Sequence, residues 1–390
     1  MIYIVVFIVL LVGAIFVDRA PYPRLRKAML GMEWLLLVCL AGFRYKIGGD
    51  TLFYMEMYDD WPSLAQWNWQ DVLDGGYQPL WYLLCAICKA ISPDFYVLQI
   101  ALALFVNTAF FRFFVRHTSR PLLAVLLYAV LLYPYYNFEI LRASVCVVLF
   151  LFSFDSLLAR RWIPYCLYAL VAIGFHLQAI LLFLFPLMVF TDRLNVRAYT
   201  IIIIIALVAA LAMDVLLYIF SFLPVGGKVY ASFFSYLIRG KEPLSVYHII
   251  TFLFKFALFV LALYATLRNP QLRLFRFFIL WELICTIFAI RYSTFFTRAM
   301  DFTHPVIILL LTELLAAGNT VENKVYNWLK YGIVAGFFII YGKIYFQPMN
   351  NLPFYRLYIP YSSVFDKHED GERDWNFYAT RHSNDILEDE

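Results

Sequence analysis

Charged residues are scarce in this sequence: they make up 15% of its 390 residues, whereas 63% of the residues are hydrophobic. A typical soluble domain contains about 25% charged residues. Charges are absent or nearly absent over long stretches, which are residues 1–17, 201–220 and 249–267. Apolar runs of this length match the hydrocarbon thickness of a bilayer, where the backbone must satisfy its own hydrogen bonds and is therefore helical. The composition excludes an ordinary soluble domain and predicts an all-α polytopic integral membrane protein.

The N-terminal apolar run lacks the features of a cleaved signal peptide. It has no basic residues before it and no small-x-small cleavage site. The basic residues come after it instead and are Arg19, Arg24, Arg26 and Lys27. We therefore expect a retained first span with its N-terminus outside and the loop 18–27 in the cytoplasm.

A complete metal or redox motif is also missing. Cys85 and Cys88 have suitable spacing, but no second cysteine pair accompanies them. All the cysteines lie within or beside apolar runs, which is typical of packing residues. The net charge of +4 arises mostly from basic residues in short loops, as the positive-inside bias produces, and does not indicate nucleic-acid binding. We expect no metal ion, no cofactor and no nucleic-acid partner.

Basic loops recur along the chain and predict its threading through the membrane. One threading places most of them in the cytoplasm if two stretches behave unusually. The stretch 79–91 must be re-entrant, and the stretch 163–190 must fold back as two short passes around a polar tip at 174–178. This threading gives about 12 transmembrane helices plus the short re-entrant helix.

No repeat, linker or low-complexity segment divides the chain. We therefore predict a single transmembrane domain over residues 1–346, which includes an outer loop at 44–78. The remaining segment, 347–390, is polar and acidic, and we expect this C-terminal tail to pack on the outer face.

Ionisable side chains gather at the outer face in this threading, although the positive-inside bias disfavours arginine there. Snorkelling to headgroup phosphates explains a single such arginine. Several arginines with a histidine and carboxylates favour a site, because guanidinium suits phosphate and stays charged in a partly dry cleft. These residues are Arg44, Asp50, Tyr54, Glu139, Arg142, His176, Arg239, Lys241, Arg291, Arg298, Asp301, Arg356 and Tyr361. They predict a site for the diphosphate of a membrane lipid.

Three local patterns within this set leave alternatives open. Two glycines let the backbone bend before Asp50, which then either caps a following helix or acts in the site. Glu139 and Arg142 have the i,i+3 spacing of an ion pair, which would explain both structurally. His176 is the polar tip of an apolar hairpin, where a simply hydrogen-bonded histidine is the alternative to a functional one.

Two further features also have structural explanations. Lys255 and Glu282 have equal predicted depth on successive spans, so we expect a structural ion pair between them. The outer loop and the helix after it carry many aromatic residues, which either stack on sugar rings or form an interfacial aromatic belt. These aromatic residues are Trp61, Trp67, Trp69, Tyr77 and Trp81.

Several short motifs resemble, in order, those of the EpsG-like family, which is related to the Wzy polymerases of O-antigen and exopolysaccharide synthesis. The first is Arg-Tyr-Lys-Ile-Gly-Gly-Asp-Thr-Leu-Phe-Tyr at 44–54. Leu-Arg-Ala-Ser at 141–144 and Gly-Phe-His at 174–176 follow. Phe-Thr-Arg-Ala-Met-Asp-Phe at 296–302 and Pro-Tyr-Ser-Ser-Val-Phe at 360–365 complete the series. The family often has Gln after the second arginine, where this chain has Ala, so a polar neighbour is missing there.

The resemblance implies a polymerase of oligosaccharide repeat units carried on undecaprenyl diphosphate, at the outer face of the bacterial inner membrane. It implies a metal-independent glycosyltransferase with a fold like the GT-C enzymes and O-antigen ligases. The implied partners are the lipid-linked oligosaccharide and membrane lipid, and a chain-length regulator protein is considered as a further one. Alternatives are a GT-C enzyme with a polyprenyl-phosphate sugar donor, for which Asp59 and Asp60 could be the acidic pair, and a flippase of lipid-linked glycans.

The expected roles follow from the chemistry of a diphosphate leaving group. Arg142 and Arg298 are expected to stabilise its developing charge, and Arg44 and Arg291 are further candidates for binding it. Asp50 and His176 are the candidate general bases for the acceptor hydroxyl. The residues expected to contact the sugar or diphosphate in addition are Tyr54 and Tyr361.

Overall fold

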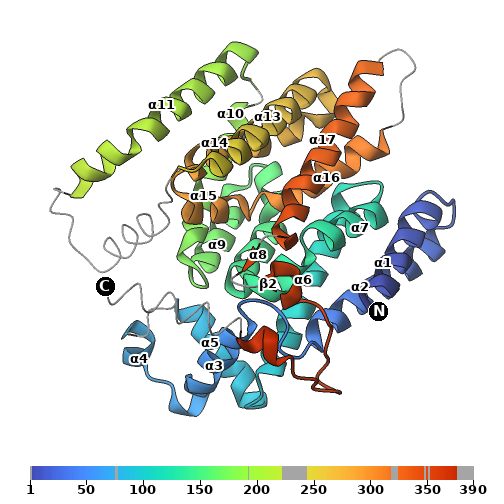
Figure 1. Ribbon diagram of the computed structural model, residues 1–390, viewed down its shortest axis with the longest axis vertical. Coiled ribbons are helices and arrows are strands. Elements are labelled where there is room, and N and C mark those ends of the chain that lie inside the picture. The colour runs from blue at the N-terminus through green and yellow to red at the C-terminus, as the bar shows by residue number, and fades with distance from the viewer. Residues whose placement is uncertain are drawn as a thin grey trace. The chain divides into compact units, whose positions relative to one another are not determined.

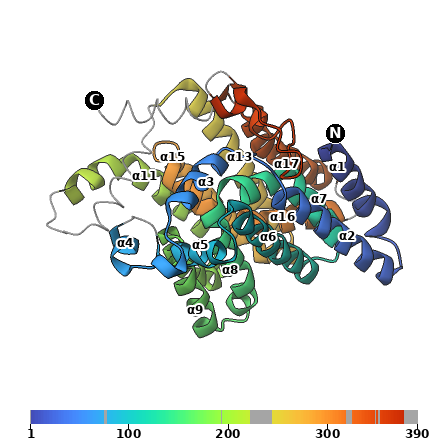
Figure 2. The same cartoon turned by 90° about the horizontal axis from the view of Figure 1, so that it is seen from below.

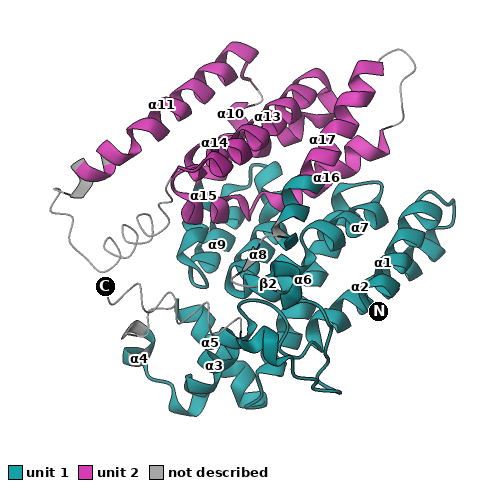
Figure 3. Ribbon diagram, viewed as in Figure 1, with its two compact units in different colours: residues 1–183, 338–390 teal, residues 184–337 magenta. Residues whose placement is uncertain are grey.

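The computed structural model describes residues 2–74, 78–191, 193–221, 244–317, 324–346, 348–349 and 352–375. This part of the chain is almost entirely helical, so the predicted all-helical class is confirmed. It divides into two compact units (Figures 1 and 3). Unit 1 comprises residues 1–183 and 338–390, and unit 2 comprises residues 184–337.

Unit 1 combines the N-terminal helices with the end of the chain. Its first elements are α1 (Ile2–Val12), the π-helical turn η1 (Gly13–Val17), α2 (Pro23–Gly42), α3 (Thr51–Asp60), η2 (Leu64–Gln66), α4 (Trp69–Asp74), α5 (Pro79–Ile91), α6 (Phe95–His117), α7 (Pro121–Leu131), the π-helical turn η3 (Tyr135–Glu139), α8 (Leu141–Leu158), α9 (Trp162–Ile173) and the start of η4 (Leu177–Leu187). Its last elements are the end of α17 (Lys324–Lys343), η6 (Ile344–Phe346), the antiparallel pair β1 (Pro348–Met349) and β2 (Leu352–Pro353), and η7 (Phe354–Leu357).

Unit 2 is built from the remaining helices. They are α10 (Met188–Thr191), α11 (Val196–Ser221), α13 (Val246–Arg268), η5 (Pro270–Phe275), α14 (Arg276–Ala289), α15 (Ser293–Met300), α16 (His304–Ala316) and the larger part of α17. Within this unit α14 packs against α11, α13 and α15.

Four helices in the described part of the chain are long and apolar enough to cross a membrane: α6, α8, the first part of α11, and α13. The pair α15 and α16 passes the same test together but is bent by 55°, which is the geometry of a broken span or a re-entrant loop. Shorter apolar helices lie at Ile2–Val17, Pro79–Ile91, Pro121–Leu131, Trp162–Ile173 and Leu177–Thr191. A multi-pass membrane protein is therefore supported, while the count of about 12 crossings stays a prediction.

Local sequence explains where several helices begin and end. Proline, whose missing N–H is not needed in the first turn, begins α2, α5 and α7. The expected interruption of the 163–190 stretch is confirmed, because α9 ends before Gly174 and η4 starts at Leu177. The helix α5 has the bounds expected for the re-entrant segment, although its path through the membrane stays a prediction.

A buried polar network holds the segment before α8 in place. The Asn107 amide on α6 donates to the side-chain oxygen of Asn137 at 2.8 Å, and the Asn137 amide donates to the hydroxyl of Tyr128 at 2.8 Å. The rings of Phe110 and Tyr128 stack beside this network with centroids 4.4 Å apart. Buried polar groups that satisfy one another fix a single geometry. The π-helical turn η3 is thereby fixed, and with it Glu139 at its end.

The C-terminal tail packs on the loop that joins α2 to α3, which the sequence places on the same outer face. The Tyr45 N–H donates to the Ser362 carbonyl at 2.9 Å, and the Val364 N–H donates to the Phe43 carbonyl at 2.8 Å. The tail also meets the first helix, because the Tyr3 hydroxyl donates to the Tyr358 carbonyl at 2.9 Å. Figure 2 shows the red segment of the tail on the side of α1. Both predicted outer segments are thus in contact.

Candidate functional site

The loop between α2 and α3 contains a position that requires glycine. Gly48 has a φ of +110°, in a region that L side chains rarely adopt. A Cβ atom there would lie 2.7 Å from the carbonyl oxygen of Phe138. The Gly48 N–H donates to the Leu357 carbonyl at 3.1 Å. Gly48 therefore lets the loop pack between the segment before α8 and the C-terminal tail.

Glu139 is buried, and its carboxylate joins three segments of unit 1. Oε1 accepts hydrogen bonds from the Gly49 N–H at 2.8 Å and the Tyr358 hydroxyl at 2.6 Å. Oε2 accepts one from the Asp50 N–H at 3.2 Å. Burial and the charge of Asp50 raise the pKa of Glu139 to about 7, and these hydrogen bonds oppose the rise. The contacts account for Glu139 without the ion pair to Arg142 that its spacing suggested.

Asp50 occupies the N-cap position of α3, but its side chain makes no capping hydrogen bond. The Glu139 carboxylate instead accepts the N–H groups of Gly49 and Asp50 just before the helix. The interpretation of Asp50 as a side-chain cap is therefore not supported. Its half-buried carboxylate remains a candidate for chemistry.

The hairpin of α8 and α9 brings Arg142 and His176 to the same place. Arg142 is the second residue of α8, one turn before Cys146. The Ala172 carbonyl accepts both the Cys146 thiol at 3.2 Å and the backbone N–H of His176 at 3.0 Å, and the Arg142 guanidinium is near enough to act electrostatically on the Cys146 sulfur. Glu139 lies two residues before α8 and accepts the Asp50 N–H, so Asp50, Arg142 and His176 lie near the same end of α8.

The imidazole of His176 is oriented by its own turn. Its Nδ1 accepts the Gln178 N–H at 3.2 Å, so in the neutral ring the proton is assigned to Nε2. The ring can therefore offer an N–H donor at Nε2 to an anion. Taking up a proton at Nδ1 would break the bond to Gln178, which makes His176 the weaker of the two candidate bases.

Aromatic residues pack α3 against α5 beside this site. The ring of Tyr54 meets that of Trp81 with centroids 5.8 Å apart, and Trp61 meets Trp81 at 6.4 Å. All three side chains are buried. The start of α5 is in turn bound to the His176 turn, because the Leu80 N–H donates to the Gly174 carbonyl at 2.8 Å.

These aromatic contacts divide the predicted stacking residues into two groups. Trp61 and Trp81 belong to the core and are not available to a sugar ring, whereas Trp69 is 62% exposed and packs on Trp67 with centroids 5.4 Å apart. The fifth residue of that set, Tyr77, lies outside the described residues.

Arg44 and Tyr361, two predicted substrate contacts, have structural contacts in unit 1. The Arg44 guanidinium is fully buried and donates to the carbonyls of Ala41 at 2.6 Å and Ile47 at 3.1 Å. Burial lowers the pKa of Arg44 to about 10, so it stays a cation at neutral pH. The Tyr361 hydroxyl donates to the Leu40 carbonyl at 3.2 Å. Both residues close the end of α2, which favours a structural role over contact with substrate.

In unit 2, Arg291 pairs with a carboxylate on another helix. It follows α14 and contacts Asp214 of α11 at 3.0 Å, and the hydroxyl of Tyr292 donates to the same carboxylate. The pair ties α11 to the end of α14.

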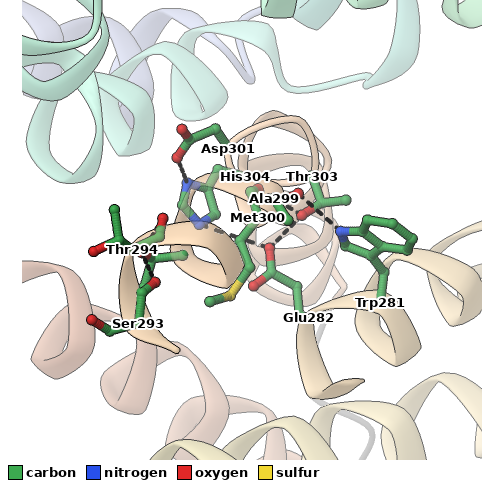
Figure 4. A network of polar contacts seen from close by, with 10 residues as sticks. Trp281, Glu282, Ser293, Thr294, Ala299, Met300, Asp301, Thr303 and His304 are labelled. Atoms are coloured by element: carbon green, nitrogen blue, oxygen red, sulfur yellow. Dashed lines mark hydrogen bonds and ion pairs between the residues drawn. The ribbon is translucent and has the colours of Figure 1, made fainter. Parts of the chain in front are cut away.

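Arg298 lies in the last turn of α15, immediately before the bend into α16. Buried polar side chains fill this bend (Figure 4): the Thr303 hydroxyl donates to Glu282 at 2.5 Å, and His304 lies 3.8 Å from the same carboxylate. On its other side His304 lies 4.0 Å from Asp301. Lys255 is near enough to act electrostatically on Glu282, while the ion pair predicted between them stays a prediction. The network fixes the bend that carries Arg298.

The predicted site residues thus fall into two sets. Unit 1 contains Arg44, Asp50, Tyr54, Arg142, His176 and Tyr361, and unit 2 contains Arg291 and Arg298. Two other predicted outer-face residues, Arg239 and Lys241, lie outside the described residues. The structure adds Tyr358, which no sequence pattern distinguishes among 29 tyrosines.

Comparison with known proteins gives one match. No curated protein and no solved structure matches the chain significantly. A family model, described as the EpsG family, matches residues 29–363. The match covers most of the chain, four of the five motifs completely, and the first four residues of the motif at 360–365. This multi-pass helical membrane protein therefore belongs to the EpsG family.

Proposed function

We propose that this protein polymerises oligosaccharide repeat units carried on undecaprenyl diphosphate, at the outer face of the bacterial inner membrane. Its family is associated with polysaccharide polymerase activity, and its apolar helices suit a lipid-linked substrate. The observation that carries the proposal is the placement of Asp50, Arg142 and His176 near the same end of α8. A carboxylate, a guanidinium and an imidazole supply the groups that such a transfer needs.

The reaction is a glycosyl transfer between two lipid-linked glycans. A sugar hydroxyl of the acceptor attacks the anomeric carbon of the donor glycan, and the bond from that carbon to the diphosphate oxygen breaks. The diphosphate leaves with the electron pair, and the hydroxyl proton passes to a general base. The developing charge on the diphosphate must be stabilised where water is scarce.

Arg142 is proposed to supply that stabilisation in unit 1. Its guanidinium is permanently charged and suits the oxygens of a diphosphate. The Nε2–H of His176 is a second donor of the right polarity in the same place. Arg298 is proposed as a further cation for the reaction on the basis of its motif and its place at the bend before α16. No metal is assigned a part in this scheme.

Asp50 is proposed as the general base. Its backbone N–H is held by the Glu139 carboxylate at the start of α3, whereas taking up a proton at Nδ1 of His176 would break the bond from the Gln178 N–H. A carboxylate also needs only modest tuning to accept a proton from an attacking hydroxyl, as in other glycosyl-transfer enzymes.

Two finer structural features belong to this proposal. The fold is proposed to be GT-C-like, with about 12 crossings, a re-entrant α5 and one transmembrane domain over residues 1–346. The tail 347–390 is proposed to pack on the outer face, and in the structure it already packs on the loop that carries Asp50.

A reconstituted reaction tests the proposal. Purified protein in nanodiscs receives an undecaprenyl-diphosphate oligosaccharide, and the products are separated on gels as a ladder. Arg142→Ala is expected to lower the rate by roughly 10²–10³-fold, as does loss of one oxyanion-stabilising donor. Asp50→Asn is expected to abolish laddering.

A matched control and a second donor separate the alternatives. Arg116→Ala removes an exposed arginine that pairs with Asp155, near the opposite end of α8, and should ladder normally. Normal laddering by Arg142→Ala would contradict the assignment of the guanidinium. Products from a polyprenyl-monophosphate sugar but not from the diphosphate would identify the alternative GT-C reaction. Transbilayer movement without laddering would identify a flippase.

A further inference from the structure

The C-terminal tail reaches the proposed active site through one hydroxyl group. Tyr358 follows η7 and donates to Oε1 of Glu139 at 2.6 Å, across 219 residues of sequence. The same carboxylate accepts the backbone N–H groups of Gly49 and Asp50. The path from the tail to the backbone of Asp50 therefore consists of two side chains and two hydrogen bonds, and a third bond holds Gly49.

Tyr358 is itself fixed from several directions. It is 5% exposed, and its ring packs against Phe138 with centroids 5.8 Å apart and against Tyr345 at 5.9 Å. Its carbonyl accepts the hydroxyl of Tyr3 at 2.9 Å. Burial raises the pKa of the Tyr358 hydroxyl well above its usual value, so the group remains a donor at any pH at which the protein works.

The Glu139 carboxylate packs closely against the backbone of Gly49. A Cβ atom on Gly49 would lie 2.7 Å from Oε2, so the loop approaches this closely only because Gly49 has no side chain. The helix α3 starts one residue after Asp50, and the orientation of its first turn depends on the two N–H groups that Glu139 holds. The side chain of Asp50 projects from that turn.

We propose that Glu139 and Tyr358 are positioning residues for Asp50: the hydroxyl of Tyr358 holds the Glu139 carboxylate, and the carboxylate holds the backbone that presents the base. The inference rests on the proposed function and deepens it. The tail thus contributes a residue to the site without contacting the reacting atoms.

The ionisation of Glu139 gives this arrangement a measurable signature. The charged and titratable groups that act on it are Asp50, Arg44, Tyr345 and Tyr358. The hydrogen bond from Tyr358 favours the ionised carboxylate and lowers the pKa of Glu139. Removing that bond should raise this pKa. As the pH falls, Glu139 should then become protonated, and stop holding the two N–H groups, at a higher pH than in the wild type.

The experiment compares pH–rate profiles of laddering for the wild type, Tyr358→Phe and Glu139→Gln. In Tyr358→Phe the acidic limb should move to higher pH by about one unit, because a hydrogen bond to a charged acceptor is lost. Its rate should return toward the wild-type value above that limb. Glu139→Gln should be slow at every pH, since the two backbone N–H groups meet different carboxylate oxygens and the NH2 group that replaces one of them cannot accept.

Tyr355→Phe is the matched control, because it removes a hydroxyl from the same η7 turn that makes none of these contacts. Its profile should superimpose on that of the wild type. A Tyr358→Phe profile that superimposes on the wild type overturns the inference. So does a rate that falls equally at every pH, because that result indicates a general loss of structure.

Hydrogen exchange provides a readout that does not depend on turnover. In the full-length protein, the peptide that contains Gly49 and Asp50 should exchange faster in Tyr358→Phe and Glu139→Gln than in the wild type or Tyr355→Phe. A wild type that makes no ladder at any pH refutes the proposed function alone, and the exchange result then decides the positioning contact. Equal exchange in Tyr358→Phe and the wild type overturns that contact.

Discussion

Substituting Gly48 by alanine should disable this protein through its backbone. At a φ of +110° an L residue costs roughly 1–3 kcal/mol. The added Cβ would also lie 2.7 Å from the carbonyl oxygen of Phe138, and backbone cannot move aside as a flexible side chain can. Overpacking of this kind costs roughly 1–3 kcal/mol more. Together they predict a local penalty of about 2–6 kcal/mol.

The penalty falls on the loop that carries the proposed base. If the loop shifts to relieve it, Gly49 and Asp50 move away from the Glu139 carboxylate, and Asp50 loses its position. A local cost of about 3 kcal/mol corresponds to a rate lower by roughly 10²-fold. We therefore expect Gly48→Ala to make short or no ladders in the reconstituted reaction.

Gly31→Ala is the control for this substitution. Gly31 lies inside α2, and nothing lies within 4 Å of where its Cβ atom would be. Alanine is the better helix former by about 0.5–1 kcal/mol, so this variant should be as stable as the wild type or more stable. Thermal unfolding in detergent and laddering are measured for both variants. If Gly48→Ala matched Gly31→Ala in both measurements, the reasoning from backbone strain would be refuted.

Three further substitutions test other parts of unit 1. Asp18→Ala should lower the free energy of unfolding by about 3 kcal/mol, because removing the buried carboxylate leaves Arg120, which it contacts at 3.2 Å, without this ion-pair partner. An unchanged thermal transition would contradict this reasoning. Glu33→Gln should change the free energy of unfolding by no more than about 1 kcal/mol, because the carboxylate is buried without a hydrogen-bond partner among the described residues and an amide has the same shape. A large loss of stability would show that the charge of Glu33 matters. Tyr361→Phe should retain most laddering and lose about 1 kcal/mol of stability with its bond to the α2 carbonyl, and a rate lower by 10²-fold would instead support direct contact with substrate.

Sequence patterns predict the parts of this protein that depend on short stretches of chain. The apolar runs predict helices because a bilayer allows little else, and the polar tip at 174–178 predicts the break between α9 and η4. The two glycines before Asp50 predict the bend there, and Gly48 does adopt a left-handed conformation. Each of these features is decided by neighbours in sequence.

Contacts between distant segments could not be predicted in the same way. The spacing of Glu139 and Arg142 suggested an ion pair, but the carboxylate binds a loop and a tail that lie far away in sequence. The burial of Trp81 depends on how α3 packs against α5, which periodicity does not determine. Arg44 resembles a substrate-binding arginine until its carbonyl partners are known.

The hydrogen bonds between the loop at 43–48 and the tail also constrain the order in which the protein can fold during synthesis. The loop at 43–48 is made early in synthesis, but the carbonyl and N–H partners that hold it belong to residues 357–364. These partners emerge only after every helix of the bundle has been made. The loop therefore cannot form these hydrogen bonds until the tail has been synthesised. A chain that ends before Tyr358 leaves the Glu139 carboxylate without its hydroxyl partner.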